Sequence, residues 1–119
     1  MRRQLTRPAR NDIAAILDWS HDRFGATGRR RYERLIARAL IAITRKIPPI
    51  GSRAADVATD GIWLFHLRNA RHDPDTKPVG RPRHFIVYRI SEPDLVIVLR
   101  VLHEAMNLPV YFTTLDREG

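Results

Sequence analysis

The chain has 119 residues, enough for a single compact domain over residues 1–119 and too few for two. The net charge of +8 is uneven, with 13 basic against 4 acidic residues up to Arg53 and 8 against 9 after it, and this asymmetry favours an acidic partner. The absence of cysteine excludes disulfides, thiolate zinc sites and a cysteine nucleophile, and the lack of any long apolar run predicts a cytoplasmic protein with no membrane span.

The first half of the chain predicts a short strand around Arg3–Thr6 and then two helices. Residues at helical spacing predict the first helix over Ala9–Phe24, ended by Gly25, and the second from about Thr27 to Ile47, ended by two prolines and a glycine. The spaced residues are Ile13, Ile16, Leu17, Ser20 and Phe24, then Tyr32, Leu35, Ile36, Ala39, Leu40, Ile43 and Ile47. The short linker makes the pair an antiparallel helical hairpin.

Four arginines recur on the side of the second helix opposite its apolar residues, within a sector of about 60°. They are Arg31, Arg34, Arg38 and Arg45, and Ile41 projects among them. Such a stripe is either a polar face turned to water or a docking surface for an acidic partner. The isoleucine among the arginines favours docking, so these five residues are the candidates for binding that partner.

The second half of the chain predicts strands. Runs rich in β-branched and aromatic residues cover Ile62–Leu67, His84–Ile90 and Leu95–Leu102, and a compact turn sequence at 91–94 predicts an antiparallel hairpin of the last two. Because Leu95–Leu99 is apolar at every position, we expect a central strand covered on both faces.

Two segments outside these elements have their own character. The polar, proline-containing connection over 68–83 predicts a long exposed loop, and the tail over 103–119 is apolar enough to pack back on the sheet or to await a partner. The predicted fold is α+β, with a short N-terminal strand and an antiparallel helical hairpin packed on one face of a three- to four-stranded, mainly antiparallel sheet.

The residue patterns of most enzyme classes are missing. The five histidines lack the paired spacing of a metal site, there is no glycine-rich phosphate loop, and none of the three serines lies in a nucleophile elbow. We therefore expect neither a metal nor a cofactor. A basic set remains on or beside the last two strands, consisting of Arg83, His84, Arg89, Arg100 and His103.

Two interpretations of Arg89 and Arg100 stay open. An arginine within an apolar strand is costly unless it is paired or faces solvent, so one interpretation is ion pairing with an acid such as Asp12, Asp18 or Glu104. The other is an anion-recognition site. A metal-independent endoribonuclease would use such a basic set, with arginine stabilising the phosphorane charge and histidine or tyrosine moving protons.

The last two strands resemble the closing signature of ParE-type toxins in the RelE/ParE superfamily, through HFIVYR at His84–Arg89 and VIVLRVLHEAMNLP at Val96–Pro109. Earlier residues agree in the family's order, namely Asp12, Ile13, Ile16, Phe24, Gly25, Tyr32, Leu35, Pro48, Pro49 and Gly51. Two departures are Asn107, where many relatives carry aspartate, and the connection over 68–83, which is longer than usual.

The resemblance implies the toxin half of a bacterial type II toxin–antitoxin pair. Its partner would be a small acidic antitoxin, ParD-like with a ribbon-helix-helix start, whose C-terminal segment wraps the toxin in a hetero-oligomer. ParE-like members poison DNA gyrase, whereas RelE-like members cut mRNA on the ribosome. Because the two branches share a fold, fold alone does not choose between them. A third possibility is a non-toxic relative that only binds its antitoxin.

The residues favour the gyrase branch, in which the chain is not an enzyme. Aligning Val87 and Tyr88 with their counterparts puts Phe85 where the ribonucleases carry a catalytic arginine, and the preceding strand has only His66 where they carry lysines. The resemblance implies toxicity residues in or near the signature, which are Arg83, Arg89, Arg100, His103 and Met106. For antitoxin binding we assign the stripe of Arg31, Arg34, Arg38, Ile41 and Arg45.

Overall fold

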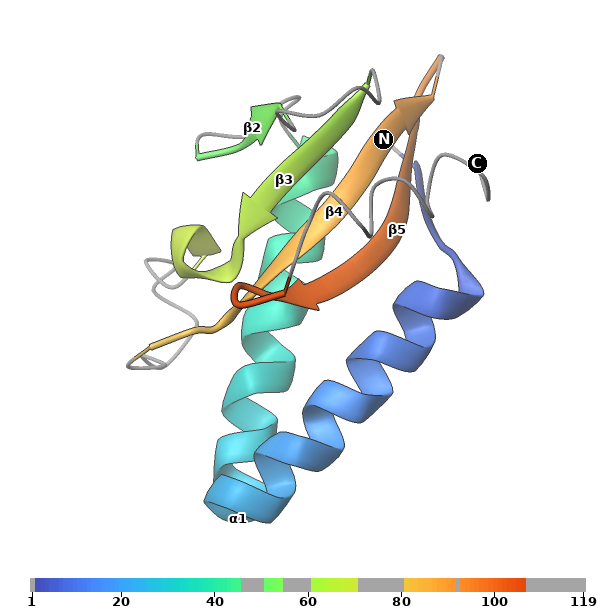
Figure 1. Cartoon of the computed structure of the whole chain (residues 1–119). Coiled ribbons are helices and arrows are strands. Elements are labelled where there is room, and N and C mark those ends of the chain that lie inside the picture. The colour runs from blue at the N-terminus through green and yellow to red at the C-terminus, as the bar shows by residue number, and fades with distance from the viewer. Residues whose placement is uncertain (1, 46–50, 55–60, 71–80, 92, 107–119) are drawn as a thin grey trace.

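The computed structural model describes residues 2–45, 51–54, 61–70, 81–91 and 93–106 (Figure 1). In chain order the elements are β1 (Arg2–Leu5), α1 (Arg7–Arg45), β2 (Arg53–Ala54), β3 (Ile62–His66), the 3-10 turn η1 (Leu67–Ala70), β4 (His84–Ser91) and β5 (Leu95–His103). The fold is α+β, as predicted. No described helix is long and apolar enough to cross a membrane.

Helix α1 is a hairpin of two arms that meet at Gly25. This glycine has φ 72° and ψ −173°, a backbone conformation that side-chain-bearing residues rarely adopt, and it reverses the chain (Figure 1). The first arm begins after Thr6, whose hydroxyl accepts a hydrogen bond from the Ala9 amide at 3.2 Å and donates to the Leu99 carbonyl at 2.8 Å. The predicted helical hairpin is therefore confirmed, and its entry is tied to the sheet.

Within the described ranges the sheet has five strands in the order β1-β5-β4-β3-β2. Strand β1 runs parallel to β5, and the other neighbours are antiparallel, so the predicted hairpin of β4 and β5 is confirmed. The prediction of three or four strands missed β2. This strand pairs only Arg53 and Ala54 with β3, and two residues are too few to produce a periodic sequence pattern.

The main core lies between the helical arms and one face of the sheet (Figure 1). A smaller cluster on the other face comprises Ile62, Leu64, Phe85, Val87 and Leu102. The strand over Leu95–Leu99 is central, as predicted, because β5 lies between β1 and β4, but the expected full cover of both faces is wrong among the described residues. Val96 and Val98 are fully buried, but Leu95, Ile97 and Leu99 are half-buried, because both helical arms pack on the same face.

The apolar spacing of the two arms was a good guide to burial except at the hairpin tip. Tyr32, Leu35 and Ile43 are buried as expected, whereas Phe24 is 64% exposed. Phe24 precedes the reversal at Gly25 and so lies away from the sheet. The residues expected to end the second helix beyond Arg45, most of the predicted loop and the tail beyond Met106 lie outside the described residues.

Candidate functional site

The arginine stripe lies along the second arm of α1. Arg31, Arg34 and Arg45 are exposed, and Arg38 and Ile41 are half-buried. The opposite side of the same arm is buried against the sheet, as the helical spacing predicted. The stripe therefore presents positive charge to solvent along the arm.

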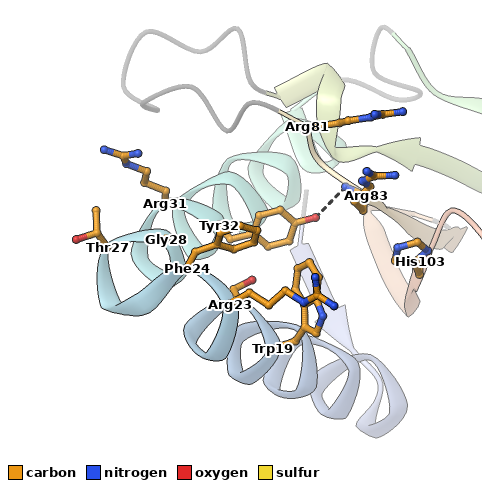
Figure 2. Close-up of a pocket in the computed structure, with 11 residues that line it drawn as sticks. Trp19, Arg23, Phe24, Thr27, Gly28, Arg31, Tyr32, Arg81, Arg83 and His103 are labelled. Atoms are coloured by element: carbon orange, nitrogen blue, oxygen red, sulfur yellow. Dashed lines mark hydrogen bonds between the residues drawn. The ribbon is translucent and has the colours of Figure 1, made fainter.

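A cavity of about 760 Å³ lies where the hairpin tip approaches the start of β4 and the end of β5 (Figure 2). Its lining comprises Trp19, Ser20, Arg23, Phe24, Thr27, Gly28, Arg31, Tyr32, Arg81, Arg83 and His103. Figure 2 shows the rings of Tyr32 and Phe24 in the middle, with Arg31 and Arg81 reaching outward at the rim. The fold thus brings Arg31, Arg83 and His103, which the sequence assigned to different sites, around one hollow.

Two aromatic side chains of this cavity were missed by the sequence analysis as site residues. The rings of Trp19 and Phe24 meet edge to face with centroids 5.9 Å apart, and the Arg23 guanidinium lies 5.4 Å from the Trp19 ring centroid. Trp19 is 38% exposed. The available signal was local, since Trp19, Arg23 and Phe24 all lie within the six residues before the turn glycine Gly25.

Tyr32 joins the helical hairpin to β4 at the inner wall of the cavity. The Arg83 amide donates to the Tyr32 hydroxyl at 3.2 Å (Figure 2). The hydroxyl also lies 2.6 Å from Nδ1 of His84, to which it donates. Burial raises the pKa of Tyr32 to about 12, and burial followed by the nearby His103 lowers the pKa of His84 to about 4. At neutral pH the tyrosine is therefore protonated and His84 is neutral.

His103 extends this cluster toward solvent. It pairs with His84 in the register of β4 and β5, and the two imidazole rings meet edge to face with centroids 5.2 Å apart. Its Nδ1 accepts a hydrogen bond from the Ala105 amide at 3.0 Å, which leaves Nε2 to carry the proton of the neutral ring. Of the two histidines, His103 lines the cavity and His84 does not.

His66 forms a separate cluster with Glu104. Its Nδ1 accepts from the Arg68 amide at 3.1 Å, and its Nε2 donates to Glu104 at 2.8 Å, so both ring nitrogens are engaged. The hydrogen bond from His66 is the main reason that the pKa of Glu104 is lowered. Arg83 lies 3.6 Å from the same carboxylate. These contacts hold the ends of β3 and β5 together beside a smaller hollow of about 260 Å³.

The structure does not bring all the predicted basic residues together. Arg100 makes a two-point contact with Asp12, with Nε–Oδ2 and Nη2–Oδ1 distances of 2.7 and 2.9 Å, so the ion-pairing interpretation holds for it. Arg89 follows His84 by five residues along β4, or about 16 Å, and so lies far from the cavity. Met106, just beyond β5, is 39% exposed.

The described part of the chain contains no group of three or more histidine, aspartate or glutamate side chains placed to hold a metal ion. What the cavity offers instead is aromatic surface surrounded by cations. Arg23, Arg31, Arg81 and Arg83 contribute four guanidinium groups, and no acidic residue is among the lining residues that the structure describes. Such a site can bind an apolar group that carries negative charge beside it.

The chain is similar to a known protein family in sequence and to a solved structure in fold. The profile described as "ParE toxin of type II toxin-antitoxin system, parDE" matches residues 4–108. The solved structure "Chromosomal ParDE TA system from P. aeruginosa" matches with a TM-score of 0.63 and 16% identity, covering 87% of this chain and 95% of that one. No curated protein sequence matches. The profile spans both helical arms and all the described residues that line the cavity.

Proposed function

The chain belongs to the ParE toxin family of type II toxin–antitoxin systems, and from this premise we propose that it poisons DNA gyrase and is neutralised by a ParD-like antitoxin. The observation that carries the proposal is the family match over residues 4–108. The α+β fold shared with the ParDE structure of P. aeruginosa supports it. In this proposal the chain acts by binding and is not itself an enzyme.

The arginine stripe on the second arm is proposed as the antitoxin-docking surface. Arg31, Arg34 and Arg45 are exposed there, and the half-buried Ile41 adds an apolar contact among the charges. A small acidic antitoxin is the partner that such a surface attracts. The family description, which pairs toxin with antitoxin, supports the presence of this partner.

For toxicity we propose the surface around the end of β5. Arg83 and His103 line the cavity there, and Met106 is exposed beside them. Arg100 and Arg89 belong to the same sequence signature, but Arg100 is engaged with Asp12, so its proposed role is to hold β5 in place. Arg83, His103 and Met106 are thus the residues proposed to contact the target directly.

An mRNA endoribonuclease is the competing function, and one observation favours it. The register of β4 and β5 brings Arg83, His84 and His103 together, as acid–base catalysis requires. Three observations weigh against it. Phe85 is buried at the position of the ribonuclease arginine, His66 has both nitrogens engaged, and His84 is a buried neutral ring whose Nδ1 is bound by Tyr32.

The two functions are separated by one pair of assays on the purified, folded protein. The first incubates it with DNA gyrase, supercoiled plasmid and ATP and measures linear DNA after treatment with detergent and protease. We expect linear DNA that depends on both proteins. The second assay measures ribosome-dependent cleavage of mRNA.

The outcomes assign the function. If gyrase is unaffected and mRNA is cut, the chain is a ribonuclease of this fold. If neither occurs but the adjacent antitoxin binds, the chain is a non-toxic relative. Arg10→Glu, an exposed charge reversal at the start of α1, serves as a control and should keep full gyrase activity.

A further inference from the structure

The cavity at the hairpin tip combines features that the proposed docking stripe lacks. Only Arg31 belongs to both. Its aromatic walls come from Trp19, Phe24 and Tyr32, and its rim carries four arginines, of which Arg83 already lies 3.6 Å from Glu104. None of the described lining residues is acidic. Large exposed aromatic side chains beside one another are uncommon on a protein that works alone, and Phe24 is 64% exposed.

Ser20 supplies a second, independent sign of a ligand. The side chain lines the cavity and the residue is only 1% exposed, yet its Oγ has no hydrogen-bond partner among the described residues. A buried hydroxyl without a partner costs free energy, and native structures contain few of them. A rotation of the Ser20 side chain toward the cavity would bring this hydroxyl to a polar group that entered there beside an apolar one.

We propose that this cavity holds an apolar side chain of an acidic segment of the antitoxin, with the neighbouring backbone reaching Ser20 and the flanking carboxylates pairing with the arginines of the rim. The inference rests on the proposed function, because it adds a second contact with the same partner. The aromatic walls remove the apolar side chain from water, and arginine is the side chain best suited to pair with carboxylates at an interface.

The ring geometry favours a peptide over a nucleic acid. A base stacks on an open ring face or between parallel rings, but Trp19 and Phe24 meet at an interplanar angle of 80° and form a corner. Arg23 already covers the Trp19 ring. The described lining residues also include no asparagine, glutamine, aspartate or glutamate to read a base edge, whereas an aliphatic or aromatic side chain fits such a corner without them.

Trp19 provides a direct test in the full-length protein. The probe is the purified antitoxin encoded by the reading frame adjacent to this gene. In a Trp63→Phe background Trp19 is the only tryptophan, so its fluorescence quenching by acrylamide reports access to the cavity. We expect the antitoxin to reduce this quenching severalfold. A 20-nucleotide single-stranded DNA, assayed in the same way, should leave it unchanged.

Affinity measurements with Trp63 in place test the same contact independently. Arg23→Glu and Phe24→Ala should each weaken antitoxin binding about tenfold, as loss of an interface anchor does. Arg10→Glu makes the same charge change as Arg23→Glu at an exposed position about 20 Å along the arm and should leave the affinity unchanged. Circular dichroism and thermal melting establish that each variant is folded.

The possible results separate this inference from the proposed function. The antitoxin could bind tightly while acrylamide still quenches Trp19 fully and Arg23→Glu keeps the same affinity as Arg10→Glu. In that case the cavity contact is wrong, but the proposed toxin–antitoxin pair is retained. If the wild-type chain does not bind the antitoxin at all, the proposed partnership itself fails. If the DNA protects Trp19 and the antitoxin does not, a nucleic acid is the occupant and the inference is overturned.

Discussion

Arg100 and Asp12 connect the last strand to the first helical arm through hydrogen bonds of 2.7 and 2.9 Å. Oδ2 of Asp12 also accepts a hydrogen bond from the Val101 amide at 3.0 Å. The side chains of Arg100 and Asp12 are 20% and 16% exposed, so the carboxylate accepts three hydrogen bonds in a site that is mostly shielded from water. Arg100 is therefore part of the framework that holds the cavity's two walls in place.

Removing this carboxylate should destabilise the fold. In Asp12→Ala the guanidinium of Arg100 loses its ion pair and the Val101 amide loses its acceptor, which we expect to lower the free energy of unfolding by about 2–3 kcal/mol. Urea denaturation measures the change. Asp18→Ala is the control, because Asp18 is 75% exposed and its 3.7 Å ion pair with Arg29 should contribute less than about 1 kcal/mol. Equal losses in the two variants would contradict the prediction.

The parts of the fold that the sequence predicted are those with a long periodic pattern. Apolar residues at helical spacing located both arms, and Gly25 marked the turn between them. Strand β2 was missed because two residues carry no period. The half-burial of Leu95, Ile97 and Leu99 was not foreseen, because an apolar run does not reveal how many layers cover a sheet.

The cavity shows why a site is harder to predict than a fold. Arg31 and Tyr32 come from one arm, Trp19 from the other, and Arg83 and His103 from the strand ends, so only the tertiary structure places them together. The sequence signature identified Arg83 and His103 through family resemblance. It carried no information on Trp19, which contacts Arg23 and Phe24 on its own arm and reaches His84 only through the tertiary structure.

A matched pair of serine variants tests whether the Ser20 hydroxyl is unpartnered in the free protein. Ser20→Ala should raise the free energy of unfolding by up to about 1 kcal/mol, because it removes a buried hydroxyl without a described partner and alanine favours the helix. Ser52→Ala should lower it by about 1–2 kcal/mol, because Ser52 shares a 2.8 Å hydrogen bond with the buried Tyr88 hydroxyl. Thermal and urea unfolding measure both, and a destabilised Ser20→Ala would show that the hydroxyl has a partner.

His84 should make the fold sensitive to mild acid. Burial lowers its pKa from 6.5 to about 4, so between these values the unfolded chain binds a proton that the folded chain does not. The contribution of His84 to stability is full above about pH 6.5 and is lost as the pH falls toward 4. After allowance for solvent screening we expect a loss of about 2 kcal/mol over this range.

The control for this pH dependence is His84→Asn. The asparagine oxygen replaces Nδ1 as the acceptor for Tyr32 but does not titrate. Urea denaturation of both proteins at pH 7, 5.5 and 4 gives the comparison, in which Glu104 and other carboxylates contribute equally. If the free energy of unfolding falls equally with pH in the wild type and the variant, His84 does not titrate across this range.

Charge reversal on the stripe should weaken antitoxin binding while the fold is kept. Arg34→Glu with Arg38→Glu changes the charge of the second arm by −4, on the side away from the buried residues of that arm. We expect the affinity for the adjacent-gene antitoxin to fall more than about tenfold in low salt and less at high salt, since exposed charges are screened. Titration calorimetry at two salt concentrations measures both effects. Arg7→Glu with Arg10→Glu makes the same change at exposed positions at the start of α1, and an equal loss there would show that net charge, rather than the stripe, governs binding.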